Sequence, residues 1–186
     1  MNNLELIKKS KKILVIGCPG SGKSYFSEKI SEAINISTIH LDTIYWKPNW
    51  VKMENEEFDK LIINQMEKES WILDGNYNRT LKLRMSYCDL VIFLDIPTEV
   101  CLNSYLERLN TPCDLRDDIT KGCYETYDED FVNYIKNFNN DNKDSNRNKI
   151  IDILSNSNKS SIILSSRDEI NQLLNNIKGW KYGFGF

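Results

Sequence analysis

The chain has 186 residues with a formal net charge of −3, and 40% of its residues are hydrophobic. This length suffices for one domain with a substantial core, so we expect a single domain over residues 1–186. The slight acidic excess argues against direct binding of nucleic acid, which depends on clustered lysine and arginine. The sequence has neither an apolar run long enough to cross a membrane nor the basic-then-apolar order of a secretory signal at its start. We therefore expect a cytoplasmic protein without membrane contact, and the sequence leaves its oligomeric state open.

Short apolar runs alternate with helical patterns along the chain. The sequence predicts strands at residues 12–16, 37–41, 70–74, 89–95 and 160–164. It predicts helices at about residues 23–34, 54–69, 79–87, 98–109, 125–138, 144–155 and 167–178. Alternation of this kind is typical of βαβ units that form a parallel sheet, which predicts an α/β fold.

Two segments stand outside this pattern. Residues 139–146 are polar and rich in asparagine, which indicates an exposed loop rather than a domain boundary. Residues 179–186 carry several aromatic side chains, and so many exposed aromatic rings are unusual. We therefore expect this tail to dock on the body of the protein or on a partner.

The five cysteines are scattered, and their odd number and lack of C-x-x-C spacing fit neither a disulfide framework nor a zinc ribbon. We expect Cys88 and Cys101, which lie in apolar segments, to be core residues. Cys113 and Cys123 flank a segment that we expect to be mobile, and a metal clip there would need two further ligands. Cys18 lies in a glycine-rich loop and is expected to face away from any bound ligand.

Residues 17–24 read GCPGSGKS, which is a complete G-x-x-x-x-G-K-S/T phosphate loop between a predicted strand and a predicted helix. The glycines allow the backbone amides to approach and surround a phosphate. Lys23 would place a cation on the β- and γ-phosphates, and the Ser24 hydroxyl would be a Mg²⁺ ligand. The sequence thus predicts binding of ATP or GTP with Mg²⁺. The nucleotide-binding residues predicted here are Gly17, Cys18, Pro19, Gly20, Ser21, Gly22, Lys23, Ser24 and Tyr25.

Carboxylates follow two of the predicted strands, at the end of the sheet where ligands of α/β proteins bind. Asp42 follows the second strand and Asp74 ends the third. Either can hold water on Mg²⁺, and each can instead be a helix cap or turn residue. Asp42 has a further possible role, which is to accept the proton or orient the hydroxyl of a phosphoryl acceptor. His40 lies on the same side of its strand as Asp42, and we expect it to be a hydrogen-bonded structural residue.

The segment at residues 42–70 is the predicted acceptor-binding part of the chain. Trp46 and Trp50 flank a proline there and can form either a wall of an acceptor pocket or a hydrophobic cap under a loop. We expect the acceptor to lie between Asp42, Trp46 and the loop that holds Asn76 and Tyr77.

Phosphoryl transfer also needs positive charge around the transferring oxygens. Several arginines lie in segments that should border the site, with surface ion pairs as the alternative for each. The predicted catalytic residues are Lys23, Arg79, Arg84, Arg108 and Arg116.

These motifs together resemble known families. Residues 73–75 with Arg79 and Thr80 resemble the L-D-G-F-P-R-T signature of adenylate kinases, residues 93–97 resemble their fourth strand, and Arg108 resembles their arginine at the start of the lid. A closer resemblance is to the adenylate-kinase-like proteins called DNA topology modulation proteins, the FlaR-type group. It covers about residues 11–175 and is carried by residues 40–42, 46–50, 71–77 and 80–81, by Arg84, and by residues 122–123 and 130–138.

The resemblance implies a three-layer α/β/α P-loop NTPase fold. Its five-stranded parallel sheet would have the order 2-3-1-4-5, and a short helical lid would lie near residues 110–125. ATP and Mg²⁺ would be the cofactors, and Arg167, in the loop after the last strand, would belong to the adenine pocket. Asn76 and Tyr77 stand where adenylate kinases have Phe-Pro, which favours an acceptor that forms hydrogen bonds.

Two hypotheses follow for function. The first is a kinase that moves the γ-phosphoryl of ATP to a small acceptor, either a nucleoside monophosphate or a hydroxyl metabolite. The second is a nucleotide-dependent regulator that hydrolyses ATP slowly and affects DNA topology through a partner. Turnover that rises strongly with one added metabolite would favour the kinase, whereas a salt-sensitive gel shift with duplex DNA would favour the regulator.

Overall fold

The computed structural model describes residues 2–109, 116–140 and 145–182, with side chains as far as residue 179. A five-stranded, wholly parallel sheet lies at its centre, with neighbouring strands in the order β2-β5-β1-β6-β7. These strands are β1 (Lys12–Gly17), β2 (Thr38–His40), β5 (Trp71–Asp74), β6 (Leu90–Leu94) and β7 (Ser160–Leu164). Counted along the chain, this is the predicted order 2-3-1-4-5, and each strand lies within two residues of its predicted bounds.

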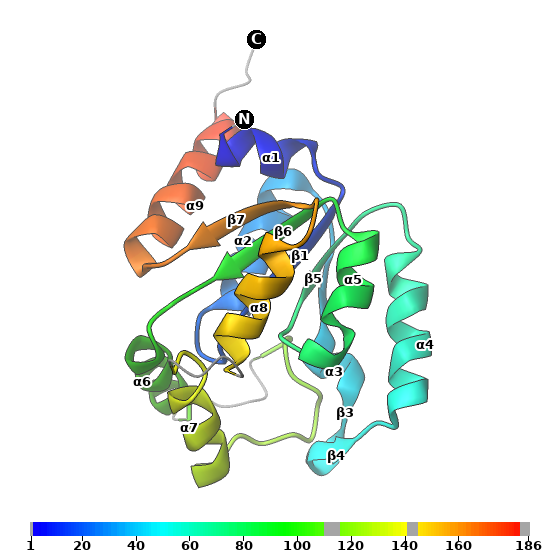
Figure 1. Ribbon diagram of the computed structural model, residues 1–186, viewed down its shortest axis with the longest axis vertical. Coiled ribbons are helices and arrows are strands. Elements are labelled where there is room, and N and C mark those ends of the chain that lie inside the picture. The colour runs from blue at the N-terminus through cyan, green and yellow to red at the C-terminus, as the bar shows by residue number, and fades with distance from the viewer. Residues whose placement is uncertain (1, 110–115, 141–144, 183–186) are drawn as a thin grey trace.

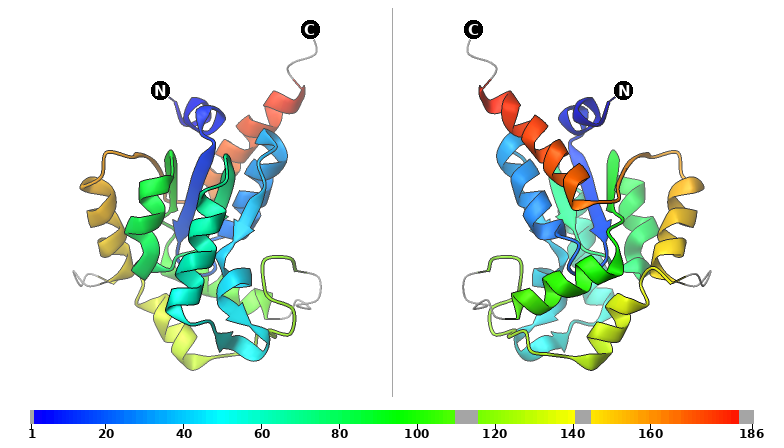
Figure 2. Two further views of the ribbon diagram at one scale, coloured as in Figure 1. Left: turned by 90° about the vertical axis from the view of Figure 1, so that its right-hand side faces the viewer. Right: turned by 90° about the vertical axis from the view of Figure 1, so that its left-hand side faces the viewer.

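Helices cover both faces of the sheet. They are α1 (Asn3–Lys9), α2 (Lys23–Ile34), α3 (Leu41–Tyr45), α4 (Asn55–Met66), α5 (Leu81–Tyr87), α6 (Thr98–Arg108), α7 (Glu129–Lys136), α8 (Asn146–Ser155) and α9 (Arg167–Tyr182). Figure 2 shows α2 and α9 on one face and α5 and α8 on the other, which gives the three layers. Because both faces are covered, β6 is apolar and buried along its whole length.

The elements that enclose the site gather at one end of the sheet. Helices α6 and α7 and a small antiparallel hairpin lie beyond the end where β1 leads into the phosphate loop (Figure 1). The hairpin pairs β3 (Trp46–Lys47) with β4 (Val51–Lys52) through a 3₁₀ turn at Pro48–Trp50. A second 3₁₀ turn, Asn78–Thr80, leads from the loop after β5 into α5.

The structure differs from the sequence predictions mainly in short elements. Helices α1 and α3 and the hairpin were not predicted, because each is too short to show a clear periodic pattern. Helix α7 begins at Glu129 rather than near residue 125, because the Asp128 carboxylate accepts hydrogen bonds from the amides of Asp130 and Phe131 and so caps it. Within the expected lid, residues 116–125 form no helix, and residues 110–115 lie outside the described part of the chain.

The cysteines and the aromatic tail were also the subject of predictions from the sequence. The thiols of Cys88 and Cys101 are buried, as predicted for core residues, and Cys18 is buried as well. Cys113 and most of the aromatic tail fall outside the described residues. Among the helices of the described chain, none combines the length and apolar character needed to span a bilayer.

Candidate active site

The phosphate loop connects the buried strand β1 to the N-terminus of α2. Gly20 and Gly22 have φ values of +80° and +88°, a region that residues with a Cβ rarely adopt. The Lys23 ammonium group folds back over the loop and donates to the Cys18 carbonyl at 3.0 Å. The Cys18 side chain is fully buried in the core, which confirms that it points away from the ligand side of the loop. The loop therefore has the shape that cradles phosphate with main-chain amides at a helix N-terminus.

We expect Gly20→Ala to destabilise the fold. A Cβ at this position would clash with the backbone carbonyl of Cys101 at the start of α6, and the left-handed backbone adds strain. The expected loss is about 2–4 kcal/mol in the free energy of unfolding, measured by urea denaturation. Gly179→Ala is the matched control, because Gly179 lies in α9 with nothing near its Cβ position, and alanine there should stabilise by about 0.5–1 kcal/mol. Equal effects of the two substitutions would contradict this account of the loop.

A cavity of about 810 Å³ opens beside the phosphate loop at the carboxyl ends of the strands. From the predicted nucleotide-binding set, it is lined by Pro19, Gly20, Gly22, Lys23, Ser24, Tyr25 and Arg167. From the other predicted sets, it is lined by Asp42, Trp46, Asp74, Asn76, Tyr77, Arg108 and Arg116. Five predicted residues are not part of its wall, namely Gly17, Cys18, Ser21, Arg79 and Arg84.

Asp74 carries an oxygen for which the described part of the chain provides no hydrogen-bond partner. The residue is only 4% exposed, and its Oδ1 atom lies 2.9 Å from Nδ1 of His40. Its Oδ2 atom is buried without a hydrogen-bond partner in the structure, although Asp74 lines the cavity. A buried carboxylate oxygen left in this state is costly unless a ligand satisfies it.

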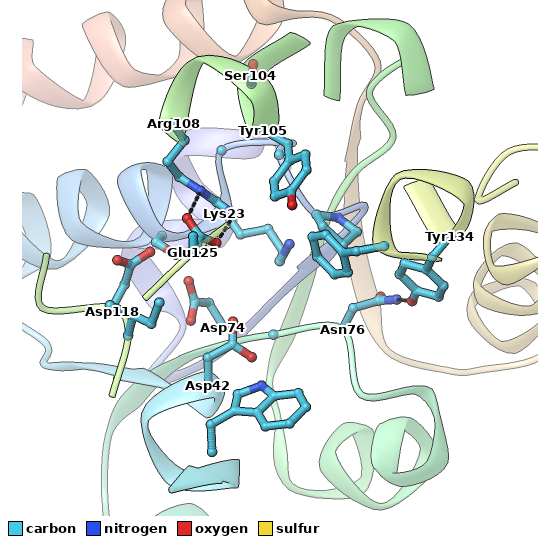
Figure 3. Close-up of a pocket in the computed structure, with 18 of the residues that line it drawn as sticks. Lys23, Asp42, Asp74, Asn76, Ser104, Tyr105, Arg108, Asp118, Glu125 and Tyr134 are labelled. Carbon is cyan, nitrogen blue, oxygen red and sulfur yellow. Dashed lines mark hydrogen bonds and ion pairs between the residues drawn. The ribbon is translucent and has the colours of Figure 1, made fainter. Parts of the chain in front are cut away.

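Asp42 lies at the start of α3, close to Asp74 and below Lys23 in the cavity (Figure 3). Its carboxylate accepts a hydrogen bond of 2.5 Å from the Tyr77 hydroxyl. Part of the Asp42 side chain is exposed to the cavity, and its carboxyl group is otherwise enclosed by protein atoms. This burial raises the pKa of Asp42; the Tyr77 hydrogen bond lowers it in part, and the nearby charge of Asp74 raises it further.

These oxygens suit a divalent cation. Ser24, Asp42 and Asp74 all line the cavity, and Asp74 has one oxygen without a partner among the described residues. Mg²⁺ bound to phosphates takes one or two carboxylates and keeps several waters, so a full cage of protein ligands is not required. Among the described residues, no cluster of three or more His, Cys, Asp or Glu forms such a cage.

Asp118 is a site residue that the sequence reasoning missed. Its carboxylate accepts two hydrogen bonds from the Arg116 guanidinium, both at 2.9 Å, and Asp118 and Ser24 both line the cavity. Burial raises the pKa of Asp118, but these hydrogen bonds and the charge of Arg116 outweigh it, so the net shift is downward. The only signal in the sequence was a stretch of mixed charge, which is usually a solvated surface.

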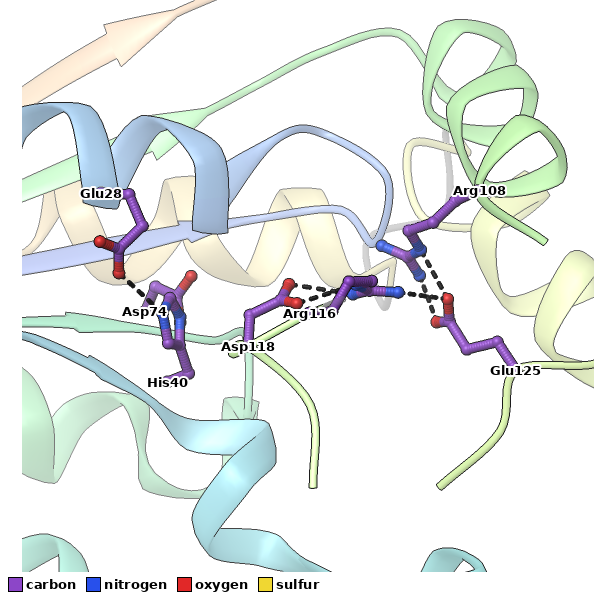
Figure 4. Close-up of polar contacts among 7 residues, drawn as sticks. All are labelled: Glu28, His40, Asp74, Arg108, Arg116, Asp118 and Glu125. Atoms are coloured by element: carbon purple, nitrogen blue, oxygen red, sulfur yellow. Dashed lines mark hydrogen bonds and ion pairs between the residues drawn. The ribbon is translucent and has the colours of Figure 1, made fainter. Parts of the chain in front are cut away.

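Two predicted arginines form a cationic group next to the phosphate loop. Arg108, at the end of α6, and Arg116 both bond the Glu125 carboxylate, at 2.6–2.8 Å and 2.5 Å respectively (Figure 4). Together with Glu125 and Asp118 they form a chain of alternating charges that begins at the end of α6. Arg108 and Arg116 line the same cavity as Lys23.

Arg167 supports the phosphate loop from behind. Its guanidinium donates to the carbonyl oxygens of Ser21 at 2.6 Å and Gly20 at 2.7 Å, and to the Ser104 hydroxyl at 3.0 Å. Because it also lines the cavity, Arg167 both holds the loop and borders the space beside it.

Arg79 and Arg84 do not reach the cavity, which corrects the catalytic roles expected for them. Arg79 forms a two-pronged ion pair with Asp59 on α4, at 2.6 Å and 2.9 Å. Arg84 is fully buried and donates to Thr80 and to the carbonyl oxygens of Gly75 and Tyr77. The turn after β5 directs both side chains away from the phosphate loop, so Arg84 holds that turn in place instead.

His40 has the structural role that was expected. Its ring bridges Asp74 and Glu28, at 2.9 Å and 3.0 Å (Figure 4). Burial alone would lower the pKa of His40, but the hydrogen bonds and charges of the two carboxylates raise it to about 9. At neutral pH the ring is therefore a cation that orients Asp74.

This bridge predicts a loss of stability with rising pH. The folded-state pKa lies above the ordinary value of 6.5, so His40 stabilises the fold fully below about pH 6.5 and loses this contribution as the pH rises through about 9. A shift of this size corresponds to roughly 3 kcal/mol at most. We expect urea unfolding in magnesium-free buffer to show wild type losing more stability than His40→Gln between about pH 6 and pH 10. Parallel pH profiles of the two proteins would contradict the bridge.

Aromatic side chains form the rest of the cavity wall. Trp46 and Trp50 from the hairpin meet edge to face at 5.4 Å between ring centroids. On another side, Phe131 and Tyr134 of α7 stack at 6.1 Å. The Asn76 amide nitrogen lies 3.4 Å from the Tyr134 hydroxyl, and its amide oxygen is buried without a partner. Trp46 is thus part of a pocket wall rather than only a cap under a loop.

Solved structures with this fold include kinases. The chain aligns with a sugar kinase from Janibacter sp. at 14% sequence identity and a TM-score of 0.51, covering 93% of this chain and 95% of the other. It aligns equally with shikimate kinase from Bacteroides thetaiotaomicron, at 14% identity and a TM-score of 0.51, covering 93% and 99%. At this identity the likeness concerns the fold.

At the level of sequence, part of the chain matches a protein of unknown function. The chain is 32% identical over 103 residues to the uncharacterized protein YqaC from Bacillus subtilis, and the match spans 53% of this chain and 56% of that protein. No family model matches the chain, so the resemblance to FlaR-type proteins stays a prediction. What the geometry and the comparisons establish together is the three-layer α/β/α fold found in P-loop kinases.

Proposed function

We propose that the protein is a phosphotransferase that moves the γ-phosphoryl of ATP to a small acceptor in the presence of Mg²⁺. The observation that carries this proposal is one cavity that contains both the phosphate loop with Lys23 and the Asp42 carboxylate. A donor phosphate on the loop and an acceptor hydroxyl at Asp42 would then lie side by side. Positioning of this kind, with electrostatic stabilisation, provides most of the catalysis in phosphoryl transfer.

Each part of the cavity has a role in this proposal. The loop amides and Lys23 hold the β- and γ-phosphates, and Arg108 and Arg116 stabilise the charge that develops during transfer. Ser24 and Asp74 are the residues that would hold Mg²⁺, which would neutralise phosphate charge when bound. Asp42 orients the acceptor hydroxyl and takes its proton. Trp46, Asn76 and Tyr77 contact the acceptor.

The organisation of the chain follows from these roles. We propose one domain, with residues 42–70 as the acceptor-binding segment and residues 110–125 as a lid that closes over the phosphates and excludes water. The solved relatives are named as kinases of sugars and of shikimate, which supports an acceptor with a hydroxyl group. The alternative, a regulatory ATPase that acts on DNA topology through a partner, would have no need for an acceptor site beside Asp42.

The test is a measurement of ADP release by the wild-type protein with MgATP and a panel of acceptors. The panel contains nucleoside monophosphates, nucleosides, sugars and ring alcohols. We expect one class to raise the rate at least about tenfold over the rate with MgATP alone. Binding of MgATP is measured separately by calorimetry. MgATP binding with no response to any acceptor would favour the regulatory alternative, and no binding of MgATP or MgGTP would refute both.

A further inference from the structure

The cations that line the cavity are concentrated around the phosphate loop. Lys23 belongs to the loop and Arg167 bonds its carbonyls. Arg108 and Arg116 share Glu125 and line the same cavity. We define the acceptor half of the cavity by Asp42, Trp46, Trp50, Asn76, Phe131 and Tyr134. Among the described residues that line the cavity here, the charged ones are Asp42, Lys52 on the hairpin and Asp128 at the start of α7.

A phosphorylated acceptor would need cations here that the described residues do not supply. Arg79 and Arg84 follow β5 beside the acceptor half, but Arg79 is paired with Asp59 and Arg84 is buried under the turn. Lys52, which pairs with Trp46 in the hairpin, also lines the cavity, and it is exposed. A single exposed ammonium group is a weak substitute for the paired donors of arginine, which bind phosphate in a two-pronged manner.

The acceptor half instead suits a flat, uncharged molecule. Two groups of aromatic side chains, Trp46 with Trp50 and Phe131 with Tyr134, line it from the hairpin and from α7. Rings of this kind pack against planar ligands. The Asn76 amide lines the cavity as well, with its nitrogen 3.4 Å from the Tyr134 hydroxyl, and an amide can exchange hydrogen bonds with polar atoms of a ring.

We propose that the acceptor is an uncharged alcohol carried on a planar ring, and that phosphorylated compounds such as nucleoside monophosphates are excluded. This inference rests on the proposed kinase function. In the reaction, the acceptor hydroxyl oxygen forms a bond to the γ-phosphorus while the bond from that phosphorus to the β–γ bridging oxygen breaks. The hydroxyl proton passes to Asp42, and the products are a phosphate monoester and ADP.

The experiment compares matched pairs of acceptors with the full-length protein. The probes are adenosine, guanosine, cytidine, uridine, thymidine and pyridoxine, each beside its own 5′-monophosphate. Quenching of tryptophan fluorescence in the presence of ADP reports binding, since Trp46 and Trp50 line the cavity, and ADP release from MgATP reports transfer. We expect at least one uncharged probe to act with kcat/KM at least about tenfold above that of its phosphorylated partner.

Two variants of the hairpin test the aromatic wall. Trp46→Leu should raise KM for the active probe by about tenfold or more, because ring contact is lost. Val51→Ala, on the same hairpin but exposed and outside the cavity wall, should leave KM unchanged. The inference is wrong if a phosphorylated probe has a higher kcat/KM than its uncharged partner. It is also wrong if MgATP binds but none of the probes does. Neither result would contradict the assignment of the nucleotide site. Failure to bind MgATP would overturn the kinase proposal itself.

Discussion

Replacing Lys23 with alanine is expected to lower ATP turnover by about 10²- to 10³-fold while the protein stays folded. The Lys23 ammonium lies over the phosphate loop, where, among the described residues, its hydrogen-bond partner is the Cys18 carbonyl at 3.0 Å. Its removal therefore takes a cation from the transferring phosphate but breaks only one internal hydrogen bond. The rate is followed as ADP release, and thermal unfolding checks the fold.

The matched control for this variant is Arg79→Ala. Both substitutions remove one cation, but the Arg79 side chain is paired with Asp59 outside the cavity and is 47% exposed. We expect turnover within about twofold of wild type and a stability change below about 1 kcal/mol, as for other exposed ion pairs. If Lys23→Ala consumes ATP at the wild-type rate, or if Arg79→Ala is as damaging as Lys23→Ala, the assignment of the phosphate site is wrong.

Asp42→Asn is expected to lower turnover by about 10²- to 10⁴-fold with little change in acceptor binding. The asparagine oxygen can still accept the hydrogen bond from Tyr77, so the pocket keeps its shape, but the group can no longer take a proton. The measurement separates kcat from KM for the best acceptor found in the panel.

The pH profile gives an independent check on Asp42. Burial raises the pKa of Asp42, so activity should fall on the acid side as this carboxylate becomes protonated. Tyr77→Phe removes a hydrogen bond that lowers this pKa, and the acid limb of kcat/KM should therefore move to higher pH. An Asp42→Asn protein with wild-type kcat, or an acid limb that Tyr77→Phe does not move, would exclude Asp42 as the base.

Much of the fold was accessible from the sequence because it depends on local patterns. The apolar run of β6 and the glycine loop after β1 are signals read within a few residues. Helix α3 and the hairpin were missed for the opposite reason. The backbone of Asn49 and Trp50 adopts positive φ in the hairpin turn, which asparagine favours but tryptophan rarely adopts.

The candidate site was harder to predict where it depends on distant contacts. Asp118 lines the same cavity as the phosphate loop although it lies about 95 positions later in the chain, and the local sequence does not predict this return of the chain. Arg79 and Arg84 were predicted from their position after β5, which was correct, but their side-chain directions are set by Asp59 and by the carbonyl groups of the turn. Order along the chain can bring a residue to the edge of a site without showing which way it faces.

The bond between Arg167 and the phosphate loop has a consequence for biosynthesis. Gly20 and Arg167 are 147 positions apart, so the loop is translated long before the arginine that braces it. At about 5–20 residues per second, a ribosome needs roughly 7–30 s to cover that distance. During that interval the phosphate loop of a nascent chain lacks its hydrogen bonds to Arg167. We therefore expect full nucleotide affinity only after α9 has left the ribosome and packed against α2.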